Sequence, residues 1–88
     1  MATYPIAFTP AAQRQLASLD PPTLRRVARR IEALGSAPRP PGAEALRGGQ
    51  GELRIRNGDW RIIYMVHDAE LLVLVIKIGH RGDVYRAR

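Results

Sequence analysis

Residues 53–64 read LRIRNGDWRIIY, and this stretch decides how the rest of the chain is expected to fold. Asn57-Gly58 is a strong signal for a two-residue β-hairpin loop, because both residue types tolerate the positive φ angles of a type I′ turn. With these two residues as the loop, the expected cross-strand pairs are Arg56–Asp59, Ile55–Trp60, Arg54–Arg61 and Leu53–Ile62.

Side chains alternate between the two faces of a strand, so the predicted hairpin has one apolar and one basic face. The apolar face holds Leu53, Ile55, Trp60, Ile62 and Tyr64. The basic face holds Arg54, Arg56, Asp59 and Arg61. Like charges directly opposite each other cost a fraction of about 1 kcal/mol, and a face that keeps them is suited to binding an anion. The alternative interpretation is a solvated face on which the long side chains spread apart.

The N-terminal half of the sequence predicts a strand followed by two helices. Alternating apolar residues in 4–8 indicate the strand, and Pro5 places it at a sheet edge or at a strand start. Thr9-Pro10 and Asp20-Pro21 each combine an N-cap side chain with a proline in the first helical turn. Gly35 is expected to end the second helix. The apolar residues at helical spacing are Ala12, Leu16 and Leu19, then Leu24, Val27, Ala28, Ile31 and Leu34.

The remaining segments complete the expected fold. Residues 36–51 are rich in Pro, Gly and Ala and predict a long surface connection. Residues 71–78, LLVLVIKI, predict a central strand covered on both faces. Residues 1–88 are therefore expected to form one small α+β domain. It has an N-terminal strand, a helical hairpin packed on an antiparallel-rich sheet, and a C-terminal three-strand meander.

The composition restricts the classes of function. The chain of 88 residues has no cysteine and two histidines without an acidic cluster, so we expect neither a metal nor another cofactor. Its 14 basic and 8 acidic residues give a net charge of +6, which favours nucleic acid or an acidic protein as partner. We expect a cytoplasmic location and no membrane partner, because the sequence shows neither a signal peptide nor a long apolar run.

Residues 79–86, GHRGDVYR, add groups that suit phosphodiester chemistry. His80 can move protons near neutral pH, and Arg81 can stabilise charge that develops on a phosphate. Tyr85 can stack on a base or donate its hydroxyl proton. An ordinary polar C-terminal tail is the alternative interpretation.

With these segments in place, the chain resembles the RelE/ParE superfamily of bacterial toxin–antitoxin toxins. The resemblance covers nearly the whole chain and is carried by LRIRNGDWRIIY and VLVIKIGHRGDVYR. Arg54, Arg61, Arg81 and Tyr85 each have a counterpart in the family. The resemblance implies a RelE-like fold, ribosome-dependent and metal-free cleavage of messenger RNA, and silencing by an acidic, RelB-like antitoxin.

Two activities occur in this superfamily. RelE-like members keep basic residues on the central strands together with the C-terminal arginine and tyrosine, whereas ParE-like members, which inhibit DNA gyrase, generally lack that set. The resemblance thus favours an endoribonuclease, an mRNA interferase that inhibits translation. The alternatives are a gyrase inhibitor on the same fold and a toxin-fold binding module without activity.

The resemblance also suggests roles for individual residues. Arg61 and Arg81 are expected to grip the phosphate, Arg54 and more weakly Arg56 to add positive charge, and Tyr85 to orient the nucleotide at the cut. Several relatives have lysines where this chain has Arg54 and Arg56, and arginine effectively cannot release a proton. His80 is therefore the predicted proton carrier, favoured as the base.

Four arginines of the second helix form a further basic cluster. We expect them either to contact ribosomal RNA phosphates or to form a solvated helix face. They are Arg25, Arg26, Arg29 and Arg30.

Overall fold

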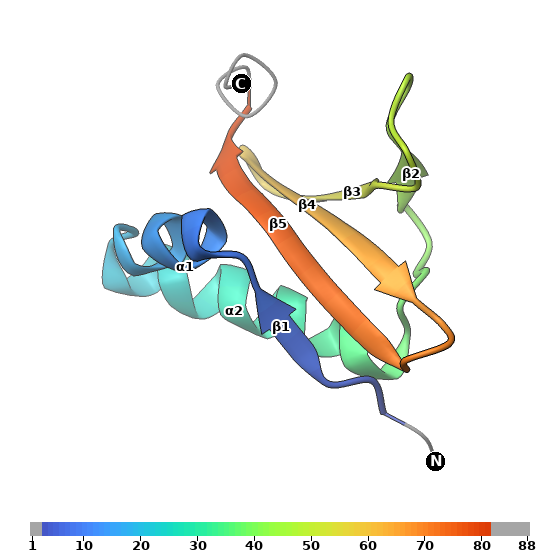
Figure 1. The fold of residues 1–88 in the computed structure, drawn as a ribbon. Helices are drawn as coiled ribbons and strands as arrows, with labels where there is room; N and C mark the ends of the chain where they lie inside the picture. Colours follow the sequence, from blue (N-terminus) through green and yellow to red (C-terminus); the bar gives the residue numbers. More distant parts are fainter. Residues whose placement is uncertain (1–2, 82–88) are drawn as a thin grey trace.

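The computed structural model describes residues 3–81, in which two helices pack on one face of a mixed sheet (Figure 1). The elements are β1 (Ile6–Phe8), α1 (Pro10–Ala17), α2 (Pro21–Ser36), β2 (Glu44–Ala45), β3 (Leu53–Asn57), β4 (Trp60–His67) and β5 (Leu72–His80). The strand order within this part of the chain is β1-β5-β4-β3-β2, with β1 parallel to β5 and the other pairs antiparallel. The predicted α+β fold with its helical hairpin and C-terminal meander is confirmed.

Both predicted helix starts are present. The Thr9 side chain accepts a hydrogen bond from the Ala12 N–H at 3.1 Å, and Asp20 accepts one from the Thr23 N–H at 3.3 Å. In each helix a proline follows the cap, where its missing N–H costs nothing. The capping residue and the proline that follows it therefore fix where each helix of the hairpin begins.

The predicted end of the second helix at Gly35 is wrong, because α2 continues to Ser36. Gly35 is buried where β1 approaches the helix, and its carbonyl accepts a hydrogen bond from the Tyr4 N–H at 2.8 Å. A Cβ atom at this position would lie 2.8 Å from the Tyr4 carbonyl oxygen, closer than real Cβ atoms come. The glycine is needed for close packing, and the helix does not stop at it.

The core lies between the helices and the face of the sheet that they cover. Its fully buried members are Ala12, Val27, Ile31 and Leu34 from the helices and Ile55, Ile62, Tyr64, Val73, Val75 and Ile78 from the strands. The Tyr64 hydroxyl donates a hydrogen bond to the Pro38 carbonyl at 2.7 Å, and burial raises the pKa of this tyrosine. This bond anchors the proline-rich connection to the core.

The β3–β4 hairpin forms in a different register from the predicted one. Gly58 and Asp59 occupy the loop, and the pairs are Asn57–Trp60, Arg56–Arg61, Ile55–Ile62, Arg54–Ile63 and Leu53–Tyr64. Gly58 has a φ of +62°, whereas Asp59 is not among the residues with positive φ. This matches a type II′ turn, which places glycine at the first central position. Arg56 therefore faces Arg61, where Arg54 was expected, and Asp59 lies in the turn.

Two further expectations about the strands need correction. The connection over residues 36–51 contains the short edge strand β2, which pairs Glu44 with Arg54. Strand β5 is interior as predicted, but no helix or strand of residues 3–81 covers its second face (Figure 1). Leu71 precedes β5 in the turn, with a φ of +52°.

Within the same described residues, none of the helices combines the length and the apolar character that crossing a bilayer requires.

Candidate functional site

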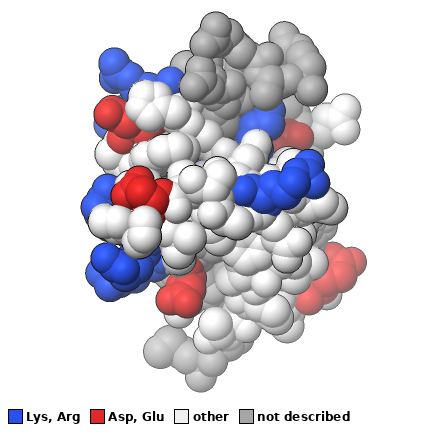
Figure 2. All heavy atoms as spheres, turned by 90° about the vertical axis from the view of Figure 1, so that its left-hand side faces the viewer, with Lys and Arg blue, Asp and Glu red and all other residues white. Residues whose placement is uncertain are grey.

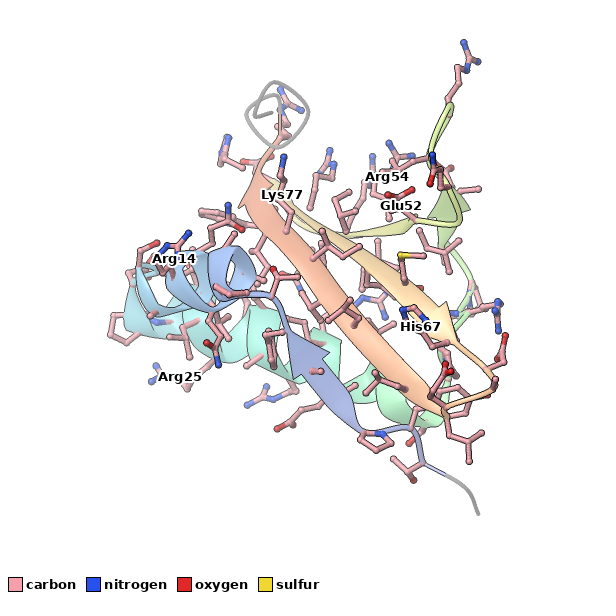
Figure 3. The ribbon with its side chains drawn as sticks, in the orientation of Figure 1. Arg14, Arg25, Glu52, Arg54, His67 and Lys77 are labelled. Carbon is pink, nitrogen blue, oxygen red and sulfur yellow. The ribbon has the colours of Figure 1, made fainter. Side chains whose placement is uncertain are left out.

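The four arginines of α2 do not all point to the same side of the helix. A shallow hollow of about 300 Å³ lies between the helix and the β3–β4 hairpin. It is lined by Arg26, Arg29 and Arg30 of α2 and by Asn57 of β3. Arg25 extends away from the sheet (Figure 3). Figure 2 shows the side of the molecule where the helices lie, with basic side chains in separate places and acidic ones between them. The hollow gathers three of the four predicted arginines, and Arg25 lies apart from it.

The predicted hairpin arginines lie together on the sheet face opposite the helices. Residues that pair across strands point to the same side of a sheet, so Arg54, Ile63 and Lys77 form one row across β3, β4 and β5. Arg56, Arg61 and Gly79 form the next row. We call this surface, with Arg54, Arg56, Arg61 and Lys77, the basic face. Figure 3 shows Arg54 and Lys77 extending on the side away from α1 and α2.

Arg54 and Arg56 border a recess at the β2 edge of this face. The recess has a volume of about 270 Å³ and is lined by Gly42, Glu44, Arg54 and Arg56. Arg54 forms an ion pair with Glu44, and its side chain is 28% exposed. Arg56 is exposed. An anion that enters this recess would meet two guanidinium groups and one carboxylate.

Arg61 lies on the basic face but is only 8% exposed. Its Nη1 donates hydrogen bonds to the Gly58 carbonyl at 3.0 Å and to the Trp60 carbonyl at 3.2 Å. These contacts tie the guanidinium to the two carbonyls of the hairpin turn. Arg61 therefore braces the turn at the end of β3, the strand that carries Arg54 and Arg56.

His80 lies on the other side of the sheet from the arginines. It pairs with Trp60, and the two rings meet edge to face with centroids 5.6 Å apart. Its Nε2 is 3.9 Å from Asp59 Oδ2, and its Nδ1 is 3.2 Å from the Arg81 carbonyl. The structure thus separates the predicted proton carrier from Arg54, Arg56 and Arg61 by the thickness of the sheet.

Arg81 follows the end of β5 directly, beside the hairpin turn. Its backbone N–H donates a hydrogen bond to the Asp59 carbonyl at 2.7 Å, and the residue is exposed. Tyr85 lies outside the described residues, so its predicted position next to Arg81 is not among them.

Sequence reasoning missed Lys77, which is the only lysine in the chain. The available signal was a lone cation inside an otherwise apolar strand, two residues before Gly79. The assumption that both faces of this strand are covered hid that signal.

A family model described as the ParE toxin of the type II toxin–antitoxin system parDE matches residues 6–85. The chain therefore belongs to the RelE/ParE superfamily of type II toxin–antitoxin toxins. It is similar to toxin RelG of Mycobacterium tuberculosis, with 33% identity over 87 residues that cover 94% of this chain and 97% of the relative.

Two solved structures show the same fold. The toxin–antitoxin complex RelBE2 of Mycobacterium tuberculosis matches with a TM-score of 0.82 and 29% identity, covering 94% of this chain and 97% of that chain. The archaeal RelE–RelB complex of Pyrococcus horikoshii matches with a TM-score of 0.76 and 27% identity, covering 97% and 99%. The match over nearly the full length of each relative agrees with the compact α+β fold.

Proposed function

We propose that this toxin is a ribosome-dependent endoribonuclease that cleaves messenger RNA and so inhibits translation. The observation that carries the proposal is the basic face, on which Arg54, Arg56 and Lys77 come from two strands and point to one side. Such a face fits a phosphodiester backbone better than a small neutral ligand, because guanidinium groups match phosphate oxygens in geometry and charge. The similarity to RelG and to RelE structures supports the same assignment.

The proposed reaction is attack by a ribose 2′-oxygen on the adjacent phosphate, with departure of the 5′-oxygen. The catalyst must align these atoms and balance the charge of the phosphorane. Arg54 and Arg56 would contact the phosphate at the β2 edge, and Arg81 would contact it from the end of β5. Tyr85 would orient the nucleotide at the cut, as the family resemblance implies.

The contacts of Arg61 support an indirect contribution. Because its Nη1 is already bonded to two carbonyls at the turn, Arg61 would hold the shape of the hairpin that carries Arg56 and add positive charge at short range. His80 is proposed as a proton carrier only by acting around the end of β5, since its ring starts from the opposite face.

We further propose that Arg25, Arg26, Arg29 and Arg30 contact ribosomal RNA. The hollow between α2 and Asn57 offers three guanidinium groups to a phosphate. Contacts of this kind release counterions, so binding to the ribosome would weaken steeply with salt.

The proposed protein partner is a RelB-like antitoxin with an acidic segment. Both solved relatives are complexes with an antitoxin, and the net charge of +6 suits an acidic ligand. The antitoxin would silence the toxin by covering the surface that meets RNA.

The test is to express the chain briefly and map messenger RNA 5′ ends with and without active translation. Cuts at fixed codon positions that disappear when ribosomes are stalled before initiation are expected. Arg56→Ala and Arg81→Ala should remove most of the cutting, while Arg47→Ala, an exposed arginine of the connection, serves as the matched control. Equal cutting by all three variants would refute the site.

The matching ParE toxin family model favours one alternative, inhibition of DNA gyrase. A supercoiling assay with purified gyrase separates the two functions. Loss of supercoiling at toxin concentrations that leave ribosome-bound messenger RNA intact would replace the ribonuclease proposal.

A further inference from the structure

The basic face lacks an obvious source of a proton for the leaving group. Arginine stays protonated throughout the working pH range and does not release its proton. Two residues of the described chain bring a side chain that can do so to this face: Lys77 and His67, which pairs with Leu72. His67 is four residues along β4 from Ile63, roughly 13 Å at strand spacing. Lys77, which pairs directly with Ile63, is therefore nearer than His67 to the arginines of the basic face.

A β-bulge places Lys77 on the basic face. Val75 pairs with Tyr64 and is fully buried in the core, whereas Lys77 pairs with Ile63 after a register shift between Ile63 and Tyr64. Without the extra residue, strict alternation would direct residue 77 to the same side as Val75, into the core. The inserted residue, Ile76, reverses the direction of the lysine.

Side chains from the N-terminal half of the chain fix this irregular backbone. The Thr9 hydroxyl donates a hydrogen bond to the Ile76 carbonyl at 2.8 Å. Gln15 Oε1 accepts one from the Ile78 N–H at 2.7 Å. Contacts from outside the strand thus hold both residues that flank Lys77. They fix the backbone position from which the lysine side chain extends.

Two arginines of the basic face lie near Lys77 on the sheet, beside its apolar partner Ile63. Arg61 is its diagonal neighbour on β4, a Cα separation of about 7–8 Å. Arg54 lies two strands away in the same row, about 10 Å at the usual strand spacing. The long side chains of Lys77 and Arg54 can extend toward one phosphate, while the buried Arg61 adds positive charge beside them.

We propose that Lys77 is the general acid of the RNA cleavage, an inference that rests on the proposed function. As the 2′-oxygen attacks phosphorus, its proton passes to solvent water and a 2′,3′-cyclic phosphate forms. The bond from phosphorus to the 5′-oxygen breaks, and the Lys77 ammonium transfers a proton to that oxygen, leaving a 5′-hydroxyl. Solvent then reprotonates the amine. The lysine ammonium carries three donor protons, one of which it can give to the leaving oxygen.

The test compares wild type, Lys77→Met and Lys77→Arg on ribosomes that carry one defined messenger RNA. The RNA is made with oxygen or with sulfur at the 5′ bridging position of the cut, because a thiolate leaves without being protonated. A general acid contributes roughly 100-fold or more, so both variants should lose about that factor on the oxygen substrate. On the sulfur substrate they should cut within a few-fold of wild type.

Other outcomes would overturn the inference. If Lys77→Met cuts the oxygen substrate as fast as wild type, Lys77 has no role in the reaction. If both variants lose the same factor on both substrates, the lysine positions the RNA and is not the acid. A wild type that leaves both substrates intact would refute the proposed function and the inference together. Thermal unfolding of each variant, with Arg47→Ala as control, shows whether the fold is kept.

Discussion

Replacing Arg61 by alanine tests whether this arginine braces the hairpin turn. The guanidinium is 8% exposed, and one nitrogen donates to the Gly58 and Trp60 carbonyls at 3.0 and 3.2 Å. Hydrogen bonds from charged groups contribute about 1.5–3 kcal/mol. The substitution also removes the like-charge contact with Arg56, which returns a fraction of about 1 kcal/mol. The expected net loss of unfolding free energy is about 2 kcal/mol.

The matched control is Arg56→Ala, because Arg56 pairs with Arg61 across the strands but is exposed. Its removal relieves the same repulsion and breaks no buried contact, so stability should stay within about 0.5 kcal/mol. Urea unfolding followed by circular dichroism measures both variants. With a slope of about 1 kcal/mol per molar urea, the Arg61→Ala midpoint should fall by about 2 M. Equal midpoints for the two variants would show that Arg61 does not brace the turn.

The other predictions concern the contributions of three residues to stability. Tyr64→Phe should cost about 1 kcal/mol because the half-buried Pro38 carbonyl loses its donor. Burial raises the pKa of Tyr64, so the unfolded chain loses its proton first, and the wild-type urea midpoint should fall more steeply above about pH 10 than that of the variant. Hydrogen bonds from Arg39 hold the pKa of Asp68 below its usual value. The ionised Asp68 carboxylate therefore adds to the free energy of unfolding at pH values above its pKa in the unfolded chain. This stabilisation is lost as the pH falls through the pKa of Asp68 in the folded protein. Asp68→Asn should therefore lower the urea midpoint at pH 7 but not at pH 2, and an equal gap at both would contradict the assignment. Leu71→Gly should raise the melting temperature. Leu71 is 51% exposed and has a φ of +52°, a left-handed conformation that costs a non-glycine residue about 1–2 kcal/mol. Leu71→Ala keeps this cost and should bring no such gain.

The faces of the hairpin were predictable even though its register was not. Moving the loop by one residue, from Asn57-Gly58 to Gly58-Asp59, shifts every cross-strand partner by two positions. Because side chains alternate with a period of two, this shift leaves every strand residue on its predicted face, and only Asp59 moves from the basic face into the turn. The arginines at 54, 56 and 61 thus share a side as expected, with different partners. The turn type depends on which position needs a positive φ, and glycine satisfies either arrangement.

The position of Lys77 was not predictable from local pattern. The bulge that redirects it is held by Thr9 and Gln15, which lie 67 and 63 residues from their partners in sequence. No periodicity within LLVLVIKI encodes contacts at that range. Strand β2 was missed for a related reason, since two edge residues in a proline- and glycine-rich segment leave no measurable alternation. The helix caps were predicted correctly because each depends on neighbours only three residues apart.

The parallel pairing of β1 with β5 has a consequence for how the chain is made. Strand β1 is synthesised before both helices, yet its only sheet neighbour among residues 3–81 is β5, the last strand in this part of the chain, with Ile6 opposite Val73. Contacts between segments so distant in sequence form slowly and only after both are available. A nascent chain therefore exposes the apolar side of its helical hairpin until β5 leaves the ribosome. During this interval the basic face is incomplete, because Lys77 and the β5 backbone that supports Arg61 have not yet joined the sheet.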